Sequence, residues 1–105
     1  YTIMKEEPFG PLVPILTFKT FDEVIERAND NDLGLCSYLY TNSMDKAHIG
    51  SEKLETGCVA VNTGVVALAE APFGGIKQTG YGREGGSGAI KDYLNVKYTH
   101  MGLKI

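Results

Sequence analysis

Residues 72–84 read Pro-Phe-Gly-Gly-Ile-Lys-Gln-Thr-Gly-Tyr-Gly-Arg-Glu, and this stretch decides how the rest of the chain is interpreted. Five glycines lie between residues 74 and 85. Each glycine would cost backbone entropy inside a regular helix or strand, so neither is expected here. The stretch instead predicts a shaped loop that wraps around a neighbour or a ligand. It lies within an irregular segment expected over residues 62–86, and connections of that length are usually functional.

The composition places the chain among soluble globular proteins. It has 105 residues, enough for one domain or part of a larger one, with 43% hydrophobic and 22% charged residues. The net charge of −3 gives no basic surface for nucleic acid. No apolar run approaches the roughly 20 residues of a membrane helix, so no membrane partner is expected. Tyr1 is not a methionine and stands inside an apparent strand, so we expect the natural protein to extend upstream.

The two cysteines do not suggest a metal or a nucleophile. Cys36 and Cys58 lie in apolar surroundings, and neither has a metal-ligand neighbour at motif spacing. Burial as small hydrophobic residues is the favoured interpretation, with a redox role as the alternative. Free thiols fit a reducing compartment, so a cytoplasmic location is expected.

Hydrophobic periodicity and turn residues predict an α/β fold. Thr20 can cap a helix, with Glu23 at the capping-box position, and Gly57 is a plausible stop for a later helix. The alternation of strands and helices favours a mostly parallel sheet with flanking helices, and a tail that could leave the domain. The expected elements are strand 11–18, helix 20–29, strand 35–40, helix 42–54, strand 58–61, helix 87–94 and strand 96–101.

The run Gly80-Tyr-Gly82-Arg-Glu-Gly85 matches the G-x-G-x-x-G pattern of dinucleotide-binding folds. That pattern requires a strand directly before it, a helix opening within it and an acidic residue about 20 positions later. Here a glycine-rich loop precedes the run and no suitable acid follows. A structural loop is therefore the better interpretation.

Three segments together carry a family resemblance. Residues 72–84, Glu6-Glu7-Pro8-Phe9-Gly10-Pro11 and Val61-Asn62 resemble the C-terminal part of an NAD(P)-dependent aldehyde dehydrogenase, in family order and spacing. The resemblance runs from about residue 1 to residue 104. It implies the C-terminal half of that family's catalytic domain over residues 1–94 and an oligomerisation strand over residues 95–105. It also implies homo-oligomers, dimers or tetramers, and NAD or NADP as the cofactor.

The resemblance assigns roles to individual residues. Glu7 would accept hydrogen bonds from the nicotinamide ribose, a task that suits an acceptor-only carboxylate; without the family, a solvated surface carboxylate would be favoured. Phe9 would pack near the nicotinamide. Phe73 would line the aldehyde pocket rather than simply pack in a core. Ala67, in the loop 64–70 that varies with substrate in relatives, would line the same substrate pocket.

Five further residues receive structural or interface roles by the same resemblance: Asn62, Gly74, Gly75, Arg83 and Lys97. Arg83 would tie the glycine-rich loop to the segment near the last strand and to a neighbouring subunit. Many relatives have Glu where this chain has Asn95, which puts a family-type ion pair in doubt. The plainer alternative is a surface ion pair of Arg83 with Glu84, worth little.

The motifs look most like the succinate-semialdehyde dehydrogenase branch. That branch uses a serine before Pro-Phe-Gly-Gly to hold the substrate carboxylate, whereas Ala67, Leu68 and Ala69 stand here. Succinate semialdehyde, a related semialdehyde and a less polar aldehyde therefore remain open. The nucleophilic cysteine, its general base and the cofactor domain lie upstream in relatives, so the chain alone is expected to be inactive. The alternative function is a non-catalytic structural or assembly module.

Overall fold

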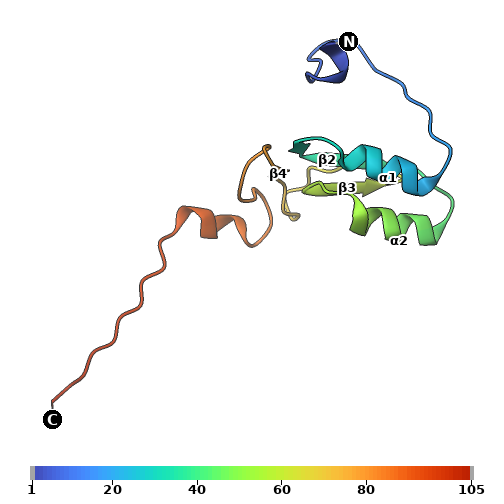
Figure 1. Ribbon diagram of the computed structural model, residues 1–105. Helices are drawn as coiled ribbons and strands as arrows, with labels where there is room; N and C mark the ends of the chain where they lie inside the picture. The colour runs from blue at the N-terminus through green and yellow to red at the C-terminus, as the bar shows by residue number, and fades with distance from the viewer. Residues whose placement is uncertain (1, 105) are drawn as a thin grey trace.

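Figure 1 shows the computed structural model, which describes residues 2–104. Short helices and strands form a small body, and the last residues extend away from it (Figure 1). The elements in chain order are η1 (Thr2–Met4), α1 (Phe21–Asn29), β1 (Leu33–Gly34), β2 (Cys36–Leu39), α2 (Met44–Lys53), β3 (Cys58–Val61), β4 (Ile76–Lys77) and η2 (Ala89–Tyr93).

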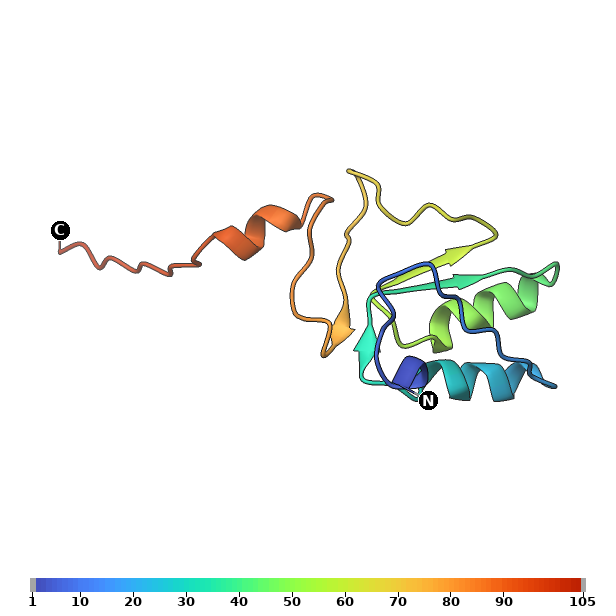
Figure 2. The same cartoon turned by 90° about the horizontal axis from the view of Figure 1, so that it is seen from above.

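The body is organised around one β–α–β unit. Strands β2 and β3 pair in parallel, from Cys36 opposite Cys58 to Leu39 opposite Val61, and α2 connects them. Figure 2 shows α1 and α2 on the same side of this strand pair. Ile25 and Ala60, only 7% and 4% exposed, mark the buried centre between the helices and the sheet. The parallel pairing expected from the element order is confirmed.

The start of α1 follows the capping prediction with one change. Thr20 has an extended backbone, and its hydroxyl accepts a hydrogen bond from the Glu23 amide at 3.2 Å. The Glu23 carboxylate accepts from the amide of Lys19 at 2.8 Å, one residue before the cap. This backbone bond is the main reason that the pKa of Glu23 is lowered. The two reciprocal bonds define where the chain enters the helix.

The role predicted for Gly57 is wrong. Helix α2 begins after Ser43, whose hydroxyl accepts from the Lys46 amide, and ends with Leu54 as its C-cap. Gly57 lies beyond that end, where the backbone passes very close to the glycine-rich loop. A Cβ atom at Gly57 would overlap the carbonyl oxygen of Gly74. The glycine is therefore needed for close packing of two segments rather than for helix termination.

The segment 62–86 is largely irregular, as predicted, but it contributes a strand that the sequence did not indicate. Strand β4 pairs antiparallel with β1, so the strand pairing is not parallel throughout. Phe73 and Glu84 form an additional isolated antiparallel bridge. These pairings fold the glycine-rich loop back on itself and fasten it to the body.

The strands predicted at 11–18 and 96–101 are both absent from the structure. A strand needs a partner for its N–H and C=O groups, and neither segment has a strand partner among the described residues. Pro11 and Pro14 also lack amide donors. Val13 is 81% exposed and Val96 is fully exposed. The short helix expected at 87–94 is present as the 3₁₀-helix η2, which covers Ala89–Tyr93 and has no side-chain cap.

Candidate functional site

Two neighbouring cavities lie beside the glycine-rich loop. The first, of about 360 Å³, is lined by Phe73 and by much of the loop. The second, of about 370 Å³, is lined by Glu7 together with residues of β1, β2 and the end of α1. Leu35 and Thr79 line both cavities. A residue predicted for the cofactor and one predicted for the substrate thus face adjacent spaces.

The other two residues predicted to contact ligands lie outside these cavities. Phe9 is 95% exposed, and neither cavity includes it. Ala67 is exposed in the loop 64–70 and also lines neither cavity. The structure therefore brings together Glu7 and Phe73 but not the full predicted set.

Phe73 is held in the cavity wall by its backbone. Its amide donates to the carbonyl of Glu84 and its carbonyl accepts from the Glu84 amide, both at 2.7 Å. The side chain is half-buried. Two short hydrogen bonds at one residue leave little freedom for the backbone from which the ring extends.

Arg83 binds carbonyl groups of the loop instead of a carboxylate. Its Nη1 donates to the carbonyl oxygens of Gly75 at 2.9 Å and Gly82 at 2.7 Å, and its backbone amide donates to Asp92 Oδ2 at 3.0 Å. Within residues 2–104, no ion pair of Arg83 with Glu84 is formed. Arg83 thus connects the two arms of the loop and, through Asp92, the loop to η2.

Asn62 closes the open end of the β2–β3 pair. Its side-chain amide accepts from the backbone N–H of Thr41 at 2.9 Å and donates to the Thr41 carbonyl at 3.0 Å. The backbone of Asn62 is left-handed, with φ of 55°, a conformation that asparagine tolerates better than most residues. The loop 64–70 therefore begins from a fixed point.

Gly75 is buried where three segments meet. A Cβ atom there would overlap the Thr79 side chain and stand 3.1 Å from the Gly34 carbonyl oxygen. At Gly74, a Cβ would lie 2.7 Å from the carbonyl oxygen of Gly82. Both glycines serve close backbone approach. Lys97 lies on the exposed tail.

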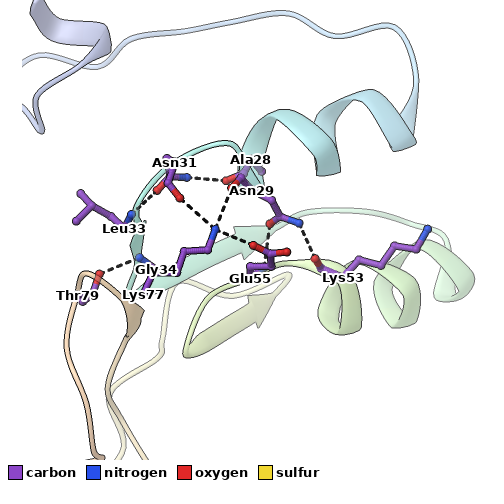
Figure 3. Close-up of polar contacts among 9 residues, drawn as sticks. All are labelled: Ala28, Asn29, Asn31, Leu33, Gly34, Lys53, Glu55, Lys77 and Thr79. Carbon is purple, nitrogen blue, oxygen red and sulfur yellow. Dashed lines mark hydrogen bonds and ion pairs between the residues drawn. The ribbon is translucent and has the colours of Figure 1, made fainter.

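A polar cluster at the base of the loop was missed by the sequence analysis. Lys77 Nζ donates to the carbonyls of Asn29 at 2.9 Å and Asn31 at 3.1 Å, and pairs with Glu55 Oε2 at 2.7 Å (Figure 3). We call these four residues the Lys77 cluster. A lysine inside a glycine-rich loop, and asparagines at and just after the end of a helix, are the sequence signals that could have revealed it.

The cysteines lie opposite each other on β2 and β3, where both are half-buried free thiols. Burial, and secondarily the neighbouring Cys58 thiol, raises the pKa of Cys36. A raised pKa keeps the group as a thiol, which is a poor nucleophile. In the part of the chain that the structure describes, no three acidic, cysteine or histidine side chains are placed to hold a metal ion. No described helix is long and apolar enough to cross a membrane.

Residues 1–99 match the aldehyde dehydrogenase family. The chain is 46% identical over 101 residues to succinate-semialdehyde dehydrogenase [NADP(+)] of Escherichia coli, covering 96% of this chain and 21% of that protein. It is 49% identical over 96 residues to glutarate-semialdehyde dehydrogenase of Pseudomonas putida, covering 91% of this chain and 20% of that protein.

Comparison of the fold with solved structures also finds aldehyde dehydrogenases. The structure superposes on the NAD⁺ complex of aldehyde dehydrogenase from Bacillus cereus with a TM-score of 0.88 and 47% identity. That alignment covers 91% of this chain and 20% of the other. The chain therefore spans about a fifth of the length of the proteins it matches.

Proposed function

The chain belongs to the aldehyde dehydrogenase family, and from this we propose that it is the C-terminal part of a longer enzyme that oxidises an aldehyde to a carboxylic acid with NAD or NADP. The observation that carries the proposal is the match of residues 1–99 to the family, together with close identity to two semialdehyde dehydrogenases. The match includes every motif on which the sequence-based resemblance rested.

The exposed surface supports a place within a larger protein. The accessible area is 9216 Å², whereas a compact monomer of 11.4 kDa exposes about 5,800 Å². The radius of gyration is 19.3 Å, against about 13 Å for a compact chain of this length. Apolar side chains such as Ile15, at 85% exposure, would be covered by further protein.

Within such an enzyme, this chain would bind and orient rather than carry out the covalent chemistry. Glu7 forms no hydrogen bond or ion pair among the described residues, so its oxygens are available to accept ribose hydroxyls. Ser37 and Thr56 line the same cavity and give it further polar character. NAD(P), when bound, supplies the hydride acceptor. Phe9 would contact the cofactor once neighbouring protein covers it, and Phe73 would form the wall beside the aldehyde.

We propose succinate semialdehyde or a related semialdehyde as the substrate. Both curated relatives above are named for semialdehydes. Residues 65–72 contain no serine or threonine, so a substrate carboxylate would have to be recognised by groups outside this loop. A reducing compartment such as the cytoplasm is the location that fits the two free thiols.

The test compares the complete enzyme with the 105-residue chain. The complete enzyme should reduce NAD or NADP with succinate or glutarate semialdehyde and turn over a neutral aldehyde of similar size more slowly. The 105-residue chain alone should give no turnover, because nucleophile and cofactor domain must be held in one geometry. Turnover by the short chain that is abolished by alkylation of Cys36 or Cys58 would contradict this assignment.

A specific observation favours assembly as a second role. Residues 95–104 form no backbone hydrogen bonds among the described residues, and Tyr98 is 85% exposed. A single extended segment with free N–H and C=O groups pairs readily with another strand. We propose that these residues join the sheet of a second copy, giving a dimer or tetramer.

A further inference from the structure

We propose that Lys77 is a positioning residue. It fixes the glycine-rich loop, which carries Phe73 as the proposed wall beside the aldehyde, to the part of the body that forms the cavity lined by Glu7. The inference rests on the proposed function of the enzyme. It starts from a backbone anomaly. Lys77 has φ of 55°, in the left-handed region that a lysine adopts at an energetic cost. Such conformations persist where surrounding contacts enforce them, and they concentrate at functional sites.

Three oxygens surround the ammonium group at the end of the Lys77 side chain. A lysine ammonium has three N–H donors, and Asn29, Asn31 and Glu55 each supply one acceptor oxygen. The Lys77 side chain is only 24% exposed, so these bonds are partly shielded from water. Figure 3 shows the side chain running from β4 to all three partners.

The partners belong to separate parts of the body. Asn29 is the last residue of α1, where carbonyl groups lack helical partners and carry partial negative charge. The Asn29 side chain in turn donates to the Lys53 carbonyl and accepts from the Glu55 amide, which joins the ends of α1 and α2. Lys77, 48 residues after Asn29, therefore fastens β4 to both helices through one group.

This attachment connects the two cavities. Phe73 lies four residues before Lys77, and the chain between them is anchored by the Arg83 bond to the Gly75 carbonyl. On the other side of the ammonium, Asn31 lines the cavity that contains Glu7. Releasing Lys77 would let the loop shift relative to the Glu7 cavity. Displacements of about 1 Å can lower catalytic rates by about a hundredfold.

The experiment uses the complete dehydrogenase with Lys77→Met, which keeps length and removes charge and donors. Lys77→Arg is the conservative variant, and Lys53→Met is the matched control. The Lys53 side chain points away from the cluster, and its participating carbonyl is retained (Figure 3). Lys77→Met should lower kcat/KM for the aldehyde about tenfold or more, mainly through kcat, with the Kd for NAD(P) unchanged. Lys77→Arg should recover part of this loss, and Lys53→Met should match the wild type.

Hydrogen exchange gives a readout that does not depend on activity. The amides of Phe73, Gln78 and Glu84 make loop hydrogen bonds and should exchange faster in Lys77→Met than in Lys53→Met. If the wild type oxidises no aldehyde, the proposed function is wrong. The exchange rates still test whether Lys77 holds the loop in place. Unchanged exchange together with kcat/KM within twofold of wild type overturns the inference, as does equal loss of aldehyde turnover and cofactor binding.

If Lys77→Met does not fold, Glu55→Gln replaces it, because the amide keeps the shape and one oxygen but removes the charge. The expected result is a smaller fall in kcat/KM with faster exchange over residues 73–80. Wild-type values for both quantities in Glu55→Gln would overturn the inference in that case.

Discussion

The body of the chain and its two ends differ in where their hydrogen-bond partners lie. Within residues 20–62, the N-caps of α1 and α2 and the β2–β3 ladder find their partners inside the segment itself. Residues 11–18 and 95–104 contain apolar and β-forming side chains but form no strand. Local sequence signals suffice when the partner is nearby in the chain. They fail for residues 11–18 and 95–104, which have no strand partner among the described residues.

The largest expected effect tests the unpaired end directly. Deleting residues 95–105 should convert a self-associating chain into a monomer, because the deletion removes the segment proposed to pair with a second copy. Light scattering on the 105-residue chain and on the version ending at Leu94 would measure this. If the intact chain is strictly monomeric, with residues 96–101 paired centrally in its own sheet, the proposed pairing with a second copy is wrong.

The second effect tests the close packing of the body. Gly57→Ala should lower the free energy of unfolding by about 3 kcal/mol, because the new Cβ would overlap the Gly74 carbonyl oxygen. Gly64→Ala is the matched control, since a Cβ there meets nothing within 4 Å. Denaturant unfolding of the complete enzyme would compare them. Equal midpoints for the two variants would show that the loop gives way easily.

The third effect concerns Glu7, an exposed residue near the N-terminus. In the complete enzyme, Glu7→Ala should weaken cofactor positioning and slow hydride transfer about ten- to a hundredfold, from loss of a bond to a charged group of about 1.5–3 kcal/mol. Single-turnover kinetics and cofactor titration would separate the two steps. If both the transfer rate and the affinity stay at wild-type values, Glu7 does not belong to the site.

The smallest effect tests a local signal within the body. Thr20→Ala should cost about 1 kcal/mol of unfolding free energy, because it removes the acceptor for the Glu23 amide. Thr20→Ser keeps the hydroxyl and should stay close to wild type. Thermal unfolding of the complete enzyme with each variant would show the difference. A Thr20→Ala protein as stable as Thr20→Ser would mean that packing alone sets the start of α1.

The sequence by itself determined the Thr20 cap, the helices that became α1 and α2, and the parallel β2–β3 pair. Motif resemblance also predicted that Glu7 and Phe73 belong to one site, and in the structure they line adjacent cavities. These predictions were made from local patterns and motifs, without knowledge of which side chains make contact in the folded chain.

Only the tertiary structure decided the contacts between segments far apart in the chain. The pairing of β4 with β1, the passage of Gly57 against Gly74 and the capping of α1 by Lys77 join residues that no periodicity or turn signal relates. The absence of strands at both ends has the same origin. A strand is stabilised by its neighbours, and pattern alone does not reveal whether those neighbours are present.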